Sequence, residues 1–292
     1  MSLAHAYRFG AYLTRLAPAR ARYGIAAGAA AAFYQFNPLR RGPARSNYAA
    51  VMRTSPSDPA VRRMVRHAAA NYGRMLADFL FLGSLPPDEV RQMLSHDGKE
   101  HVDAALAGGR GAILALPHMG SWDLCGSLAG LFGYQIVAVA EPMPGSLNRE
   151  IVATRSRHGL QIVMLGRSAV RELSRALASN HLVALLCDLP HGAGVSVRMF
   201  GTTVTVPAGP GALACRHLCP ILPVYSRRTA PGRYHVHIDP PILPPDAPAG
   251  RDGSAEMMQR VADRFQAFIA RHPDQWYAFR PFMTGSSSPP GH

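Results

Sequence analysis

The sequence predicts an α/β fold in which a mostly parallel central sheet is flanked by helices and preceded by an N-terminal helical arm. From residue 98 onward, short apolar runs alternate with segments whose apolar residues recur at helical spacing, a pattern typical of parallel βαβ units. Before residue 46, arginines surround a helical apolar stripe. A chain of 292 residues with 48% hydrophobic content can bury the core of one large domain with appendages.

The predicted elements follow one another in a regular order. A long helix should begin at Asp58-Pro59, because a capping residue is followed by proline at the first helical position. Periodicity then predicts strands over 111–117, 135–140, 161–164, 181–187, 221–226 and 233–239, and a hairpin over 196–200 and 203–206. It predicts the intervening helices over 100–107, from 121, about 147–158, 169–179, 210–218 and 254–271.

The arm, residues 1–45, has the pattern of a basic amphipathic helix. Phe9, Tyr12, Leu13 and Leu16 share one face, with arginines around it. Such a helix either lies in a membrane interface or packs as an ordinary surface helix. We expect the glycine- and proline-containing stretch 36–43 to break it, residues 46–284 to form the main domain, and residues 285–292 to be a disordered tail.

Charge and cysteine usage narrow the function classes. There are 31 basic and 18 acidic residues, for a net charge of +13, which favours a polyanionic partner. No nucleic-acid-binding signature is found, so an anionic membrane surface is the expected partner and nucleic acid is not. Four cysteines are too few for a disulfide framework. Cys215, His217 and Cys219 do not make a metal-ligand set, and we expect no metal.

His118 and Asp123 are the first candidate catalytic residues. The histidine follows the apolar run 111–117, and the aspartate falls in the first turn of the next helix. If Ser121 caps that helix, Asp123 comes back beneath the imidazole, giving a general base with an orienting carboxylate. The alternative is a buried histidine beside a capping aspartate. No serine or cysteine stands where a nucleophile would, so the base would act directly on a substrate hydroxyl.

Two further acids end apolar strands. Glu141 follows the strand predicted over 135–140, and Asp188 follows the one over 181–187. Ligand sites in open α/β sheets lie beyond the carboxyl ends of strands. Both side chains are therefore expected to line the site, with Glu141 binding an acceptor sugar or holding Arg155.

A longer set of motifs resembles a known family. His-x4-Asp after a hydrophobic strand looks like the signature of the glycerolipid acyltransferase superfamily. The block GGRGAILALPHMGSWDLCG (108–126) resembles the lipid A biosynthesis (lauroyl/myristoyl) acyltransferase family, and within it the actinobacterial phosphatidylinositol mannoside acyltransferases. The similarity continues through residues 139–142, 148–159, 187–189, 197–201 and 206–210 to HPDQWY at 272–277, about residues 60 to 282.

The resemblance implies acyl transfer from a thioester, acyl-CoA or acyl carrier protein, to a lipid-linked hydroxyl, with no other cofactor. His118 would take the hydroxyl proton and Asp123 would orient it. Arg155 is the candidate for stabilising the carbonyl oxygen, unless it forms a structural ion pair. Arg198 and Gly209 lie in the matching motifs, and Gly209 opens a helix whose N-terminus either favours anions or makes a tight turn. The mannoside enzymes carry another acid where this chain has Leu186, which puts a second catalytic carboxylate in doubt.

The resemblance also bears on location and on the competing reaction. We expect a monomer, peripheral or monotopic on the cytoplasmic face of the bacterial inner membrane. A thioesterase that uses the same histidine on water is the alternative. A serine hydrolase would need Gly-x-Ser-x-Gly, which the sequence lacks. Trp276 and Tyr277 either anchor the C-terminal segment in the core or sit at a membrane interface.

Overall fold

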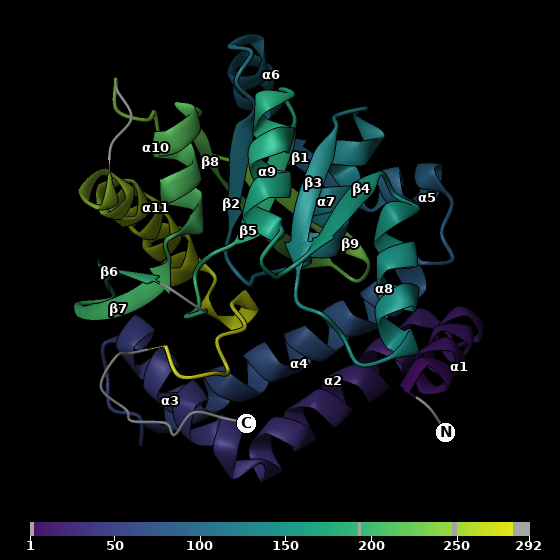
Figure 1. Ribbon diagram of the computed structural model, residues 1–292. Helices are drawn as coiled ribbons and strands as arrows, with labels where there is room; N and C mark the ends of the chain where they lie inside the picture. Colours follow the sequence, from purple (N-terminus) through teal and green to yellow (C-terminus); the bar gives the residue numbers. More distant parts are fainter. Residues whose placement is uncertain (1–2, 192–193, 247–249, 283–292) are drawn as a thin grey trace.

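A computed structural model describes residues 3–191, 194–246 and 250–282 of the chain. A seven-stranded sheet in the order β1-β9-β8-β2-β5-β3-β4 forms its centre, and β6 and β7 pair separately (Figure 1). The strands are β1 (Leu94–Asp97), β2 (Ala112–Leu116), β3 (Ile136–Ala140), β4 (Leu160–Met164), β5 (Leu182–Leu186), β6 (Gly194–Met199), β7 (Thr202–Pro207), β8 (Ile221–Ala230) and β9 (Arg233–Ile238).

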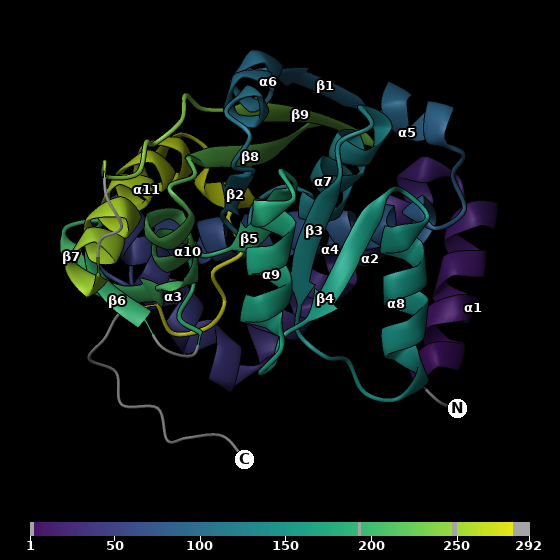
Figure 2. The ribbon, with the colours of Figure 1, turned by 45° about the horizontal axis from the view of Figure 1, so that its top comes forward.

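Helices surround the sheet, and the first run of them precedes strand β1 (Figure 2). In chain order, the helices are α1 (Leu3–Leu16), α2 (Ala19–Phe36), α3 (Pro38–Met52), α4 (Pro59–Leu82), α5 (Pro87–Gln92), α6 (Lys99–Ala107), α7 (Trp122–Leu131), α8 (Ser146–Ser156), α9 (Ala169–Ala178), α10 (Gly209–His217), α11 (Arg251–Arg271) and the 3₁₀ turn η1 (Pro273–Gln275).

The predicted fold class is confirmed. Strands β8, β2, β5, β3 and β4 run parallel, while β9 is antiparallel to β8 and β1 is parallel to β9. All five residues of β2 are buried, because Ile113 and Ala115 face one apolar cluster and Ala112, Leu114 and Leu116 face another. Burial on both faces explains why this strand reads as a continuous apolar run.

Helix α4 begins where its capping signal predicts. The Asp58 carboxylate accepts a hydrogen bond from the Ala60 amide at 2.7 Å, and Pro59 is the first helical residue. This hydrogen bond is the largest cause of the lowered pKa of Asp58. Figure 1 shows α4 crossing below the carboxyl ends of the parallel strands, so it forms one wall of the region where those strands end.

Several elements were not predicted, and contacts with distant segments account for α3 and β1. The predicted break falls at Asn37, where α2 ends, but helix α3 then covers the rest of that stretch although it contains Pro43. Its Asn47 is buried and donates to the carbonyl oxygens of Ala278 and Arg280 at 2.8 and 2.7 Å. The short strand β1, helix α5 and the 3₁₀ turn η1 were also not predicted.

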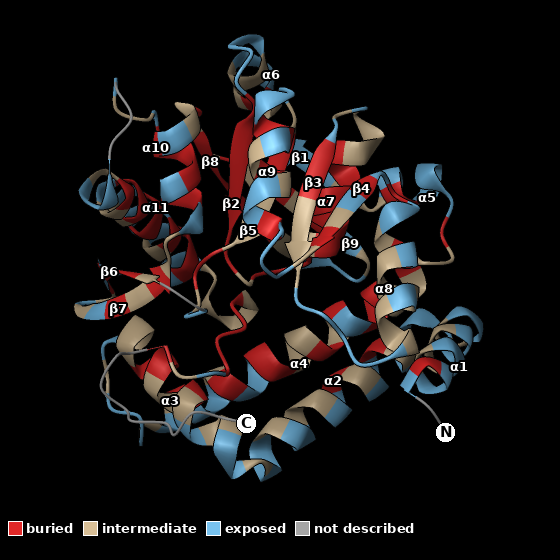
Figure 3. Ribbon diagram, viewed as in Figure 1, coloured by how far each residue is buried: buried red, intermediate tan, exposed pale blue. Residues whose placement is uncertain are grey.

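The arm is attached to the domain but leaves its apolar stripe uncovered. Tyr23 of α2 donates a hydrogen bond to buried Asp78 of α4 at 2.5 Å, and Tyr234 of β9 donates to the same carboxylate at 2.6 Å. Burial raises the pKa of Asp78. By contrast, the predicted apolar face of α1 is exposed, with Phe9 57% and Leu16 64% accessible (Figure 3).

The structure also bears on the cysteines, on membrane-spanning helices and on the predicted domain bounds. All four cysteines are free and buried. Among the described residues, no helix is both long and apolar enough to cross a membrane. The division of the chain at residue 45 stays a prediction, and the tail 285–292 lies outside the described residues.

Candidate active site

His118 and Asp188 meet because their strands are neighbours. Each residue lies two positions beyond the end of a parallel strand, His118 after β2 and Asp188 after β5. The two strands are paired in register, with Leu116 opposite Leu186. Equal extensions from two paired strands therefore bring the two side chains together at the carboxyl edge of the sheet.

The pair has the geometry of a base and its orienting carboxylate. Nδ1 of His118 lies 2.6 Å from Oδ1 of Asp188, and the His118 backbone N–H donates to Oδ2 at 2.9 Å. Asp188 is fully buried, whereas the His118 side chain is 30% exposed. With Nδ1 protonated and bound to the carboxylate, neutral His118 carries its free electron pair on Nε2. That nitrogen can accept a proton from a substrate hydroxyl.

The predicted contact between Asp123 and His118 is wrong. Asp123 is the second residue of α7, and its Oδ1 lies 2.6 Å from Nε of Arg155 on α8. Ser121 is the residue before the helix, but its side chain makes no capping bond. The first turn of α7 thus directs Asp123 toward α8, while the ring nitrogen of His118 is taken by Asp188 from the next strand.

Arg155 forms the structural ion pair that was one of its two predicted roles, and its role in stabilising the carbonyl oxygen stays a prediction. Its side chain is 20% exposed and Asp123 is 6% exposed, so the pair is mostly removed from water. Its guanidinium also lies over the Phe79 ring, 5.7 Å from the centroid. The pair ties α7 to α8 through the arginine Nε.

Glu141 stands at the same edge of the sheet with partners other than Arg155. Its Oε1 lies 3.2 Å from Nδ1 of His191 and 3.9 Å from an arginine nitrogen of Arg280. The Glu141 side chain is 53% exposed. The expected contact with Arg155 is thus wrong, and Glu141 instead joins a half-exposed charged group with His191 and Arg280.

Arg198 and Gly209 lie on elements that pack against α11. Arg198 is an exposed residue of β6 whose backbone exchanges two hydrogen bonds with the Gln259 side chain, at 2.8 and 3.0 Å. Gly209 is the first residue of α10, and a Cβ at that position would meet nothing within 4 Å. Their predicted roles in substrate binding stay predictions.

The C-terminal segment, an element that the sequence alone did not connect to His118, fixes the loop that carries it. The Tyr277 backbone N–H donates to the His118 carbonyl at 2.8 Å, and the Gly120 N–H donates to the Gln275 carbonyl at 3.1 Å. Gly120 has a φ of +58°, and a Cβ there would lie 2.0 Å from the Ser226 carbonyl oxygen. Only glycine fits this turn.

Trp276 is the site residue whose role the sequence did not indicate. It is fully buried, and its indole Nε1 donates to Oδ2 of Asp188 at 2.7 Å. A core position is thus confirmed over a membrane-interface position for both Trp276 and Tyr277. The available signal was the tryptophan itself, since a buried indole N–H needs an acceptor.

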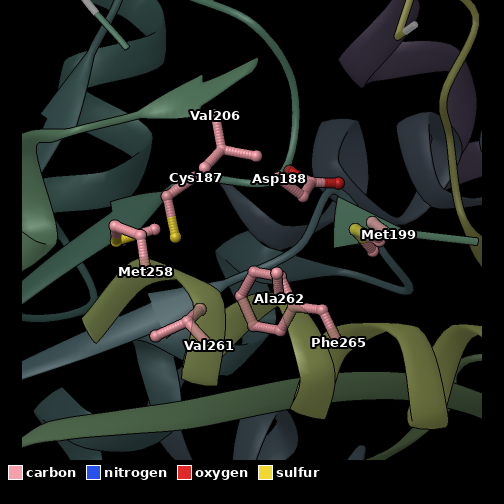
Figure 4. Close-up of a pocket in the computed structure, with 8 residues that line it drawn as sticks. All are labelled: Cys187, Asp188, Met199, Val206, Met258, Val261, Ala262 and Phe265. Atoms are coloured by element: carbon pink, nitrogen blue, oxygen red, sulfur yellow. The ribbon is translucent and has the colours of Figure 1, made fainter. Parts of the chain in front are cut away.

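An apolar wall stands on the other side of Asp188. Figure 4 shows side chains from β7, α11 and the end of β5 around a narrow pocket next to the aspartate, among them Cys187, Val206, Met258 and Phe265. Burial raises the pKa of the Cys187 thiol well above its usual value. The thiol is therefore protonated at neutral pH, so it is poorly suited to act as a nucleophile.

Comparison with known proteins shows which sequences this chain is similar to. Residues 2–282 match the family described as bacterial lipid A biosynthesis acyltransferase. The chain is 31% identical over 248 residues to a phosphatidylinositol mannoside acyltransferase of Mycobacterium tuberculosis, covering 81% of this chain and 75% of that protein. It is 32% identical over 244 residues to the protein of that name from Mycolicibacterium smegmatis, covering 81% and 77%.

A solved structure shows a distant similarity to this chain. It is a 1-acyl-sn-glycerophosphate acyltransferase from Thermotoga maritima, 14% identical, with a TM-score of 0.39 over 85% of this chain and 95% of that one. The family match and the mannoside relatives show that this chain belongs to the bacterial lipid A biosynthesis acyltransferase family and is an acyltransferase.

Proposed function

We propose that the enzyme transfers a fatty acyl group from a thioester, acyl-CoA or acyl carrier protein, to a hydroxyl of a glycolipid or phospholipid, with phosphatidylinositol mannosides as the first acceptors to test. The observation that carries the proposal is the His118–Asp188 pair, which leaves Nε2 of a partly exposed imidazole free. The curated relatives are named for acylating phosphatidylinositol mannosides.

The proposed reaction needs one base and no protein nucleophile. Nε2 of His118 accepts the proton of the acceptor hydroxyl as its oxygen attacks the thioester carbonyl carbon. The tetrahedral intermediate collapses with cleavage of the C–S bond, and the imidazolium returns the proton to the thiolate. Asp188 holds the ring with Nδ1–H toward itself and stabilises the imidazolium between the two proton transfers.

The direct test is transfer of a labelled palmitoyl group by the purified chain. With palmitoyl-CoA and phosphatidylinositol mannosides, we expect a lipid product heavier by one palmitoyl group and one equivalent of free CoA. Mass spectrometry of the lipid and a thiol assay measure the two. A parallel reaction with palmitoyl carrier protein identifies the donor. If the enzyme instead released the same amount of thiol with and without the lipid acceptor, and formed no acylated lipid when the acceptor was present, the result would support a thioesterase.

We also propose that the exposed apolar residues of α1, α2 and α3 dock on an anionic bilayer. We name this set the arm face: Leu3, Phe9, Tyr12, Leu13, Leu16, Ile25, Phe33, Phe36 and Leu39. Each of its members is between 46% and 82% exposed. Apolar side chains flanked by arginines such as Arg15 and Arg20 suit a surface of apolar chains beneath acidic headgroups.

Removing two members of the arm face should weaken membrane binding. In the double variant Phe36→Ser/Leu39→Ser, we expect the partition coefficient on vesicles containing phosphatidylglycerol to fall at least about tenfold. Burial of each side chain in the interface contributes on the order of 1 kcal/mol to the free energy of binding. Cosedimentation measures the partition coefficient. Leu243→Ser is the matched control, because Leu243 is 60% exposed outside the arm. An equal loss in both variants would contradict this assignment.

A further inference from the structure

The orientation of the Asp188 carboxylate depends on few hydrogen bonds. Oδ1 faces Nδ1 of His118 at 2.6 Å, while Oδ2 accepts from the His118 backbone N–H at 2.9 Å and from the indole Nε1 of Trp276 at 2.7 Å. The carboxylate is fully buried beside an apolar wall. In such surroundings each N–H donor counts more than it would in water.

Trp276 is itself held in place from several directions. The Tyr48 hydroxyl donates to the Trp276 carbonyl oxygen, and Trp276 pairs with Met119 as an isolated β-bridge. Its ring contacts those of Phe200 and Phe282, with centroid distances of 5.6 and 5.3 Å. An indole fixed in this way presents its N–H to Asp188 at one position, so it can set the rotation of the carboxylate.

We propose that Trp276 is a positioning residue for the transfer reaction, acting on His118 through Asp188. Its indole N–H holds Oδ2, which leaves Oδ1 directed at the imidazole ring. Without that donor the carboxylate can rotate, and the ring loses part of the constraint that aims Nε2 at the acceptor hydroxyl. This inference rests on the proposed function, because it assigns Trp276 to the same His118–Asp188 pair.

The test is a double-mutant cycle on kcat. Trp276→Phe keeps a buried ring but removes the N–H donor, and we expect kcat to fall between about 10- and 100-fold, as for a misdirected catalytic group. KM should change by less than about twofold, because Trp276 is fully buried. In the Asp188→Asn background the same substitution should lower kcat by less than about twofold, since coupled residues are not additive.

A structural control separates positioning from anchoring. Tyr48→Phe removes the hydroxyl that bonds the Trp276 carbonyl while leaving the indole N–H intact, so we expect it to retain kcat within about threefold. If Trp276→Phe unfolds, site-specific replacement of Trp276 by 3-benzothienylalanine keeps the shape of the side chain and removes only the donor. The thermal midpoint of each variant shows that the folded enzyme is being compared.

The outcomes distinguish this inference from the function it rests on. Additive losses in the cycle, or equal losses in Tyr48→Phe and Trp276→Phe, would overturn the positioning role while leaving the His118–Asp188 pair intact. Wild-type kcat in the Asp188→Asn variant alone would instead overturn the pair. Non-additive losses of kcat with unchanged KM would establish the role.

Discussion

A His118→Ala variant should bind acyl-CoA normally and transfer the acyl group about 10³- to 10⁴-fold more slowly than the wild type. A positioned general base contributes roughly 10²- to 10⁴-fold to a rate, and no other imidazole contacts Asp188 among the described residues. The loss should appear in kcat, with KM for the donor changed by less than about threefold. Initial rates at several donor and acceptor concentrations separate the two constants.

The alanine variant also leaves Oδ1 of Asp188 without its ring partner, which could disturb the loop. His118→Asn is the matched control, because its amide can donate a hydrogen bond to Asp188 but cannot take up a proton at neutral pH. We expect both variants to be equally slow. An asparagine variant with near wild-type kcat would show that His118 acts through structure and not as a base.

The parts of the fold that the sequence predicts are those with strong local signals. Strand β2 is an unbroken apolar run, and α4 combines a capping aspartate, a proline and a long apolar face. Strand β1 has the sequence Leu-Ser-His-Asp with three exposed residues, so no apolar pattern marks it. It exists because its backbone pairs with β9 at the sheet's edge. Pairing with a distant segment is not encoded in its own four residues.

Helix α3 shows how distant contacts overcome local signals. Pro43 removes one backbone donor from the helix interior, and Gly42 also disfavours helix. Against these stand a cap from Asn37, whose side chain accepts from the Leu39 amide at 3.1 Å, and the fully buried Tyr48. The partners of Asn47 and Tyr48 lie more than 200 residues away in the C-terminal segment. Local analysis cannot weigh such contacts.

The site follows the same rule. The position of His118 at a strand end could be predicted, and so could the presence of Asp188 at the same edge of the sheet. The sequence alone could not show which acid orients the histidine, because that depends on which strand lies next to β2. Strand β5 is that neighbour. Asp123, although only five residues away, is carried by α7 to Arg155 on α8.

Replacing Asp188 by asparagine should therefore lower activity, whereas replacing Asp123 by asparagine should lower stability. Asp188→Asn keeps the size of the side chain but removes the charge that selects the tautomer of His118, and we expect kcat to fall about 10³- to 10⁴-fold, as for the buried acid of a Ser-His-Asp triad. Asp123→Asn leaves Arg155 without its carboxylate in a mostly buried position. We expect it to lower the free energy of unfolding by on the order of 3 kcal/mol.

The two properties can be measured on the same preparations. Urea unfolding gives the stability of each variant, and kcat measured well below the unfolding transition gives its activity. Asp123→Asn should keep kcat within about tenfold of the wild type, because its carboxylate contacts α8 and not the imidazole. If instead Asp123→Asn were stable and inactive while Asp188→Asn were active, the histidine would be oriented by Asp123 during the reaction. Acyl transfer would then require a rearrangement of the first turn of α7 that exchanges Arg155 for His118.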